Sequence, residues 1–163
     1  MVYSLESIAK LKRRKAEKLL KSFKVSKDEF EGTEFYRDKR TPYYSNVNFI
    51  YPYIGKKEDH YWLRIKFQYA ADDWLFINRA ILLIDGEKYT VTGNWQRDNN
   101  SCIWEWLDIL VEAKERNILG KISNAKSVKI RYQGSKYYKD RTITCKEKSI
   151  IKKTLEIYDS LKK

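Results

Sequence analysis

The chain has 163 residues, of which 42% are hydrophobic and 15% aromatic, and its formal net charge at pH 7 is +12. This composition excludes a disordered or low-complexity protein. The longest apolar runs, such as residues 80–84, are far shorter than the ~18 residues of a membrane-spanning helix. Because no leader peptide or lipidation cysteine follows Met1, we expect a folded cytoplasmic protein.

The residue types that familiar enzymes need are scarce. Cys102 and Cys145 are the only cysteines and are expected to be free thiols, since a chain of this size does not need a disulfide. His60 is the only histidine, which argues against a zinc site and against Cys-His or Ser-His catalysis. No glycine-rich phosphate loop or nucleophile elbow occurs. We therefore expect no catalytic residues and no cofactor.

The positive charge is concentrated at the two ends of the chain. Residues 1–24 carry a net charge of +6 and residues 121–163 one of +9, whereas residues 25–120 carry −3. If the two terminal segments are helices that pack side by side, their basic faces form one surface that attracts polyanions. The alternative is a solvated face that serves solubility.

Apolar side chains recur near a period of 3.6 after Ser4, a residue type that caps helices well. These positions are Leu5, Ile8, Leu11, Ala16, Leu19, Leu20 and Phe23. We expect residues 1–24 to form a basic amphipathic helix that packs on, or extends from, a single β-rich domain spanning residues 25–163. The polar side of this helix is expected to present the first candidate binding residues, Lys12, Arg13, Arg14 and Lys15.

The segment from Val25 to Thr41 is polar and acidic and is expected to be a connecting loop. Seven runs rich in aromatic and branched residues follow it, as is typical of strands. They are Asn48–Ile54, Tyr61–Tyr69, Trp74–Ile84, Lys88–Thr92, Cys102–Ile109, Ser127–Gln133 and Lys136–Ile143. Asp85-Gly86 and Gly134-Ser135 are hairpin signals that join neighbouring runs in antiparallel order.

Two further helices are expected in the C-terminal third of the chain. Glu112–Asn124 offers one apolar face through Ile118, Leu119 and Ile122. Thr144 and Glu147 have the spacing of a capping box at the start of the last helix. The expected fold class is therefore α+β: an antiparallel β-sandwich or strongly bent sheet flanked by N-terminal and C-terminal helices.

Several stretches together suggest a family resemblance. They are Tyr69–Ile77, Ile103–Trp106, Ile130–Gly134 and Tyr137–Thr144. They resemble an uncharacterised bacterial domain that occurs in hypothetical proteins and in the exported part of some lipoproteins. The resemblance covers roughly residues 25–160 and implies no known reaction.

Acidic pairs are the natural place to look for a metal or for catalysis. Asp72 and Asp73 could hold a divalent cation, or they could form a turn between strands and pair with Arg131 or Arg141. We expect the turn, because neighbouring side chains on a strand point to opposite faces. Glu105 and Asp108 are likewise expected on opposite faces of one strand, which argues against an acid and base pair.

Aromatic and basic residues alternate in the hairpin near residue 135, a mixture that stacks bases and neutralises phosphates in single-stranded nucleic-acid binders. The candidate binding residues there are Arg131, Tyr132, Tyr137, Tyr138 and Arg141. Trp104 and Trp106 share one strand face because they are two residues apart, so that face is a candidate groove or interface.

Three functions fit these observations. The first is a non-enzymatic module that binds a macromolecular partner, most naturally a protein, and its mark is an exposed aromatic patch. The second is binding of nucleic acid or nucleotide phosphate through the basic ends and the aromatic hairpin, and its mark is a steep salt dependence. The third is an enzyme of an unfamiliar class, which needs a deep pocket with convergent carboxylates or perturbed lysines.

Overall fold

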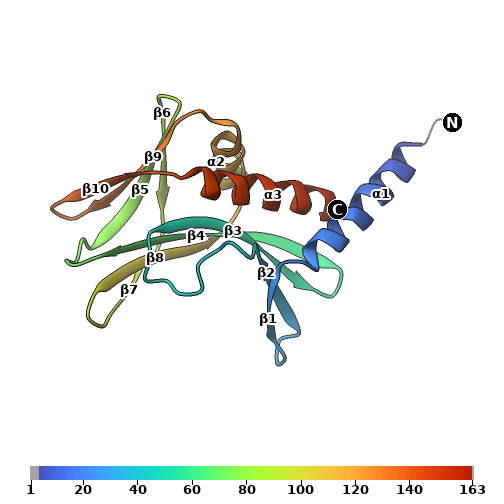
Figure 1. The fold of residues 1–163 in the computed structure, drawn as a ribbon, viewed down its shortest axis with the longest axis horizontal. Helices are drawn as coiled ribbons and strands as arrows, with labels where there is room; N and C mark the ends of the chain where they lie inside the picture. The colour runs from blue at the N-terminus through green and yellow to red at the C-terminus, as the bar shows by residue number, and fades with distance from the viewer. Residues whose placement is uncertain (1–3, 163) are drawn as a thin grey trace.

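The computed structural model describes residues 4–162, which form three helices and ten strands (Figure 1). The helices are α1 (Leu5–Leu20), α2 (Ala113–Asn124) and α3 (Cys145–Leu161). The strands are β1 (Lys24–Asp28), β2 (Thr33–Arg37), β3 (Phe49–Lys57), β4 (His60–Ala71), β5 (Ile77–Ile84), β6 (Glu87–Thr92), β7 (Gln96–Asn99), β8 (Ile103–Leu110), β9 (Val128–Gly134) and β10 (Tyr138–Thr142).

The strands form two sheets in which every neighbouring pair is antiparallel. The large sheet has the order β1-β2-β3-β4-β8-β7 and the small sheet the order β10-β9-β5-β6. The large sheet curls so strongly that side chains from five of its strands line one cavity on the face turned away from α3. We call this face the concave face. The α+β fold with a strongly bent antiparallel sheet and terminal helices confirms the expected fold class.

The hydrophobic core lies between the other face of the large sheet, the small sheet, α2 and α3. Strand β4 shows how the sequence divides the two faces. Leu63, Ile65 and Phe67 are buried in the core, whereas the intervening Arg64 and Lys66 point to the concave face. The alternation of apolar and polar residues along one strand therefore produces both the core and the concave face.

Both C-terminal helices begin where the sequence predicts. The Thr144 hydroxyl accepts a hydrogen bond from the Glu147 N–H, and the Glu147 carboxylate accepts one from the Thr144 N–H, which completes a capping box. Helix α2 begins after Glu112 with a second capping box, closed by Glu115. These local hydrogen bonds satisfy amide groups that a helix end otherwise leaves unpaired.

Three local predictions are wrong or incomplete. The segment expected as a connecting loop contains the β1–β2 hairpin, whose polar residues belong to an outer, largely solvated part of the sheet. Strand β7 was not expected, because its residues Gln96–Asn99 have no apolar alternation and are all exposed. The hairpin between β9 and β10 exists, but its two turn residues are Ser135 and Lys136, since the Gly134 N–H bonds to the Tyr137 carbonyl.

Helix α1 begins after the Ser4 cap, as predicted, and its first turns extend away from the rest of the molecule (Figure 1). Its buried residues are Ala16 and Leu20 in the second half, whereas Leu5 and Leu11 are 87% and 53% exposed. The second half of α1 therefore packs on the body of the protein, whereas its first half extends from it. Among residues 4–162, no helix combines the length and the apolar character needed to cross a bilayer.

Candidate functional site

The concave face holds a cavity of about 230 Å³, which we call the concave cavity. Its lining residues come from β1, β2, β3, β4 and β8 and are mostly aromatic or charged. They are Ser26, Phe35, Arg37, Tyr51, Tyr53, Lys66 and Asp108. The strand register explains this assembly, because Tyr51 faces Lys66 and Lys66 faces Asp108 across neighbouring strands.

Asp108 is the carboxylate of the cavity, and its charge is already engaged. The Arg64 Nε lies 2.9 Å from Asp108 Oδ1, and the Tyr53 hydroxyl donates to Asp108 Oδ2 over 2.6 Å. Burial, reinforced by the hydrogen bond to Asp108, raises the pKa of Tyr53, so the phenol keeps its proton. Asp108, Arg64 and Tyr53 thus form a closed network at one side of the cavity.

Arg37 and Lys66 are the other cations of the cavity, and within residues 4–162 neither of them has an acidic partner at salt-bridge distance. The Lys66 Nζ donates to the Ser45 hydroxyl over 2.7 Å and lies 6.0 Å from the centre of the Trp106 ring. Burial lowers the pKa of Lys66; Asp108 opposes this effect and the like charge of Arg37 adds to it. Two cations therefore face one small, partly desolvated space.

A loop crosses beside the concave face and is anchored to it by backbone groups. The Gln68 side-chain amide donates to the carbonyls of Tyr44 and Val47, and Asn48 exchanges hydrogen bonds with the backbone of Ala70. The loop exposes Tyr43 and Tyr44, whose rings pack edge to face with centroids 4.9 Å apart. The rim of the concave face thus includes exposed aromatic rings.

Trp104 and Trp106 lie on the same face of β8, as the sequence predicts. Their cross-strand partners on β4 are Ala70 and Gln68, which belong to the concave face. Both tryptophans are half-buried. Glu105 lies on the opposite face from Asp108, also as predicted. Trp106 therefore borders the cations of the cavity, whereas Glu105 belongs to the core.

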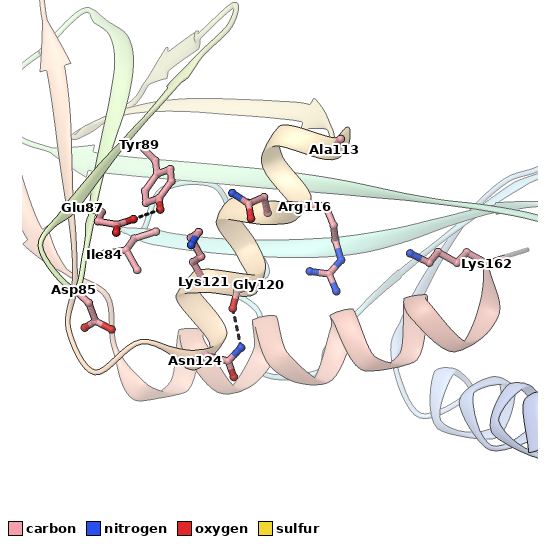
Figure 2. Close-up of a pocket in the computed structure, with 11 residues that line it drawn as sticks. Ile84, Asp85, Glu87, Tyr89, Ala113, Arg116, Gly120, Lys121, Asn124 and Lys162 are labelled. Carbon is pink, nitrogen blue, oxygen red and sulfur yellow. Dashed lines mark hydrogen bonds between the residues drawn. The ribbon is translucent and has the colours of Figure 1, made fainter.

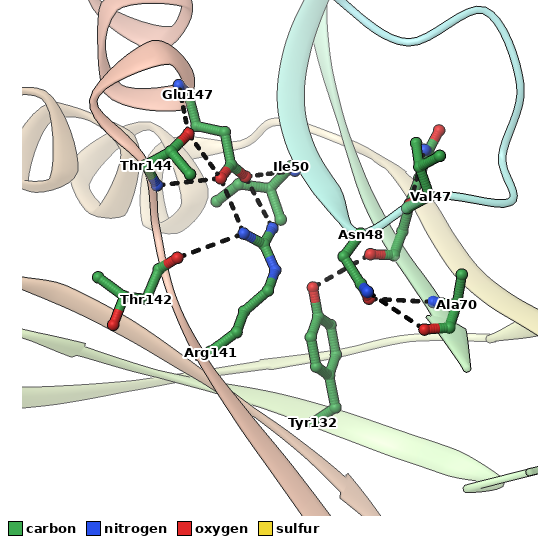
Figure 3. Close-up of polar contacts among 10 residues, drawn as sticks. Val47, Asn48, Ile50, Ala70, Tyr132, Arg141, Thr142, Thr144 and Glu147 are labelled. Atoms are coloured by element: carbon green, nitrogen blue, oxygen red, sulfur yellow. Dashed lines mark hydrogen bonds and ion pairs between the residues drawn. The ribbon is translucent and has the colours of Figure 1, made fainter. Parts of the chain in front are cut away.

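The candidate residues of the aromatic hairpin fall into two groups. Two of them face inward, so their prediction as surface contacts is wrong (Figure 3). Tyr132 is buried in the core, where its hydroxyl donates to the Gln68 carbonyl and burial raises its pKa to about 12. Arg141 makes a two-pronged ion pair with the buried carboxylate of Glu147, with distances of 2.8 and 2.7 Å. Both residues face inward because side chains alternate between the two faces of a strand. Arg131 and Tyr138 lie on the other, outer face of the hairpin.

The remaining hairpin candidates are exposed. The Arg131 guanidinium lies 3.7 Å from the centre of the Tyr138 ring and pairs with Asp140 rather than with Asp72 or Asp73. Tyr137 is 71% exposed at the tip of the hairpin. These three side chains therefore reach solvent, and their role in binding stays a prediction.

The four basic residues of α1 do not share one role. Lys12, Arg14 and Lys15 are exposed, and Lys12 and Lys15 line a groove against α3 that also contains acidic Glu156 and Asp159. Arg13 instead points to the body, where its guanidinium donates to the Leu161 carbonyl over 3.1 Å. The predicted merged basic face of the two terminal helices is therefore a surface of mixed charge.

Asp72 and Asp73 form the turn between β4 and β5, as expected, and both are exposed. Their predicted pairing with Arg131 or Arg141 is wrong, since those arginines pair with Asp140 and Glu147. Within residues 4–162, no three His, Cys, Asp or Glu side chains come together as a metal site would require.

A further cavity, of about 750 Å³, lies between the β5–β6 hairpin, α2 and the end of α3 (Figure 2). Most of its charged side chains are engaged with neighbouring side chains or with the backbone. The Tyr89 hydroxyl donates to Glu87, Arg116 pairs with Asp159, and Asp85 accepts from the N–H groups of residues 126 and 127. This cleft therefore offers fewer free charges than the concave cavity.

Neither a protein family, a curated protein nor a solved structure matches this chain. The resemblance over residues 25–160 therefore stays a prediction. The concave cavity was missed by reasoning from the sequence, although the alternation of Arg64, Lys66 and Gln68 with apolar residues in β4 contained the relevant signal. Only the pairing of distant strands shows that Arg37 joins Lys66 there.

Proposed function

We propose that the protein is a non-enzymatic binding module of the cytoplasm whose concave face receives a carboxylate of a protein partner. The observation that supports this most directly is the pair of cations, Arg37 and Lys66, which face one cavity while Asp108 is engaged by Arg64. A carboxylate between the two cations would relieve their mutual repulsion in a site of reduced dielectric.

The size and surroundings of the cavity favour a side chain or chain end over a larger ligand. A volume of about 230 Å³ accommodates a carboxylate with a few methylene groups. Phe35 and Tyr51 line the cavity, and the Trp106 ring lies beside Lys66; such rings are enriched at protein interfaces. Binding rather than catalysis is proposed because the acidic group of the cavity, Asp108, is fixed in an ion pair.

The cytoplasmic placement rests on cysteine chemistry. Cys102 and Cys145 are both exposed and free, a state that the reducing cytoplasm maintains. It is tested by fractionating cells that express the tagged chain.

The binding proposal is tested by selecting a random peptide display library on the purified protein. Enriched peptides should share an aspartate, a glutamate or a free C-terminal carboxylate. Replacing Arg37 or Lys66 by Gln should weaken their binding about tenfold or more, as expected for a lost charge-assisted hydrogen bond. Binding should persist at high salt because the contact is partly buried and rimmed by aromatic rings.

Lys88→Gln is the matched control, since it removes the same charge from an exposed site on β6. It should leave peptide binding unchanged, and all variants should keep the wild-type melting temperature. Failure to enrich any peptide contradicts the proposal, as does equal binding of peptides whose carboxylates are replaced by amides.

A further inference from the structure

A second cavity, of about 500 Å³, lies where the turn between β4 and β5 meets the tip of the β9–β10 hairpin. We call it the aromatic cavity. Its lining includes the aromatic residues Tyr69, Trp74, Tyr137 and Tyr138 and the basic residues Lys136 and Lys139. No part of the proposed carboxylate site takes part in it, so the two sites are independent.

A buried carboxylate holds one wall of the aromatic cavity in place. Glu105 is fully buried and accepts hydrogen bonds from the N–H groups of Leu75, Phe76 and Ile77 and from Arg97. Phe76 has a φ of 55°, an uncommon conformation for a residue with a side chain, and this network maintains it. The ring of Trp74, stacked on that of Phe76 with centroids 6.0 Å apart, is thereby held at the cavity.

Gly134 allows the two walls to approach each other. A Cβ atom at this position would lie 1.9 Å from the Leu75 carbonyl oxygen, so no other residue fits without moving the turn. The turn that carries Trp74 is therefore packed directly against the hairpin that carries Tyr137 and Tyr138.

The opposite wall is exposed and basic. Tyr137 is 71% exposed, and Tyr138 has the Arg131 guanidinium stacked 3.7 Å from its ring centre. Lys136 and Lys139 are exposed, and no acidic side chain of the described part of the chain lies within salt-bridge distance of either. Asp73 is the acidic residue of the lining, so the lysines leave the cavity with net positive charge.

We propose that the aromatic cavity binds a phosphorylated nucleobase, with the base stacked on Trp74 and Tyr137 and the phosphate held by Lys136 and Lys139. Aromatic rings stack on the face of any base, and lysines neutralise phosphate without requiring one geometry. A neutral ligand such as a sugar would leave the two lysines without a counter-charge. The same chemistry occurs in a free nucleotide and in a single strand of nucleic acid.

Fluorescence polarisation with labelled DNA and RNA of about 12 nucleotides, single-stranded and duplex, tests this proposal at about 50 and about 200 mM salt. Single strands should bind more tightly than duplexes of the same sequence, because only unpaired bases can enter the cavity. Tyr137→Ala should weaken binding about fivefold or more, the loss expected for one stacked base. Replacing Lys136 and Lys139 together by Gln should weaken binding and reduce its salt dependence.

Tyr43→Ala is the matched control, because Tyr43 is 73% exposed on the loop beside the concave face. It should leave nucleic-acid binding unchanged. Calorimetric titration with AMP distinguishes the two sources: binding that Tyr137→Ala weakens assigns a free nucleotide, whereas binding of oligonucleotides alone assigns a strand. The proposal is overturned if neither ligand binds, if duplexes bind as tightly as single strands, or if Tyr137→Ala and Tyr43→Ala behave alike.

Discussion

The two acidic residues of β8, Glu105 and Asp108, lie three residues apart, one buried in the core and the other partly exposed. Glu105 is fully buried on the core side and accepts hydrogen bonds from three backbone N–H groups and Arg97. Asp108 lies on the concave face, where its side chain keeps 30% of its surface exposed and pairs with Arg64. In the core, Glu105 fixes the backbone of the turn before β5. On the concave face, Asp108 lies among three cations, Arg37, Arg64 and Lys66.

Glu105→Ala should produce the largest loss of stability, about 3–5 kcal/mol, because it leaves buried N–H groups and Arg97 without their acceptor. Asp108→Ala should cost only about 1 kcal/mol, since that ion pair is partly exposed and screened by solvent. Urea denaturation of both variants measures the difference. Equal losses in the two variants would contradict the division between a structural and a surface acid.

Glu147 is a third engaged acid, and its contribution to the stability of the fold depends on pH. Burial alone would raise its pKa, but the ion pair with Arg141 and the hydrogen bonds from Thr144 and from the Ile50 N–H hold the pKa below its ordinary value of 4.5. A carboxyl with a depressed pKa in the folded state contributes stability that is fully present above pH 4.5 and is lost as the pH falls through the folded pKa.

Glu147→Gln should therefore lower stability at pH 7 by about 2–3 kcal/mol and flatten its decline below pH 4.5. Melting temperatures of wild type and variant between pH 7 and about pH 3 test this. A wild-type curve that is flat through the acid range would show that the ion pair does not stabilise the fold.

The smallest effect is expected for the basic residues of α1. Replacing Lys12, Arg14 and Lys15 together by Gln should change stability by less than about 0.5 kcal/mol, because all three are exposed. Adding Arg13→Gln should cost up to about 1 kcal/mol more through the lost bond to the Leu161 carbonyl. Thermal melts of the triple and quadruple variants separate the two contributions, and indistinguishable melts would show that Arg13 does not help to dock α1.

Patterns within a few neighbouring residues predicted the elements whose formation depends on local interactions. The capping box at Thr144, the apolar face of α2 and the alternation in β4 were all readable, because each depends on neighbours within a few residues. The β1–β2 hairpin was not, since its pairing with β3 rather than its own polar sequence makes it part of the sheet.

The candidate sites depend on long-range pairing and were correspondingly harder to predict. Strand alternation assigns Tyr132 and Arg131 to opposite faces, but the sequence does not show which face is turned to the core. The same ambiguity hid the concave cavity, where Arg37 and Lys66 meet only after β2, β3 and β4 have paired.

Both sheets are open, so residues 4–162 contain four edge strands: β1, β7, β6 and β10. Unpaired edges invite strands of other molecules to add to them, and lysine or arginine side chains are a common way to prevent this. Three of the edges carry exposed lysines, Lys27, Lys88 and Lys139, whereas Arg97 on β7 is turned inward to pair with Glu105. Part of the large positive charge therefore protects the protein against aggregation.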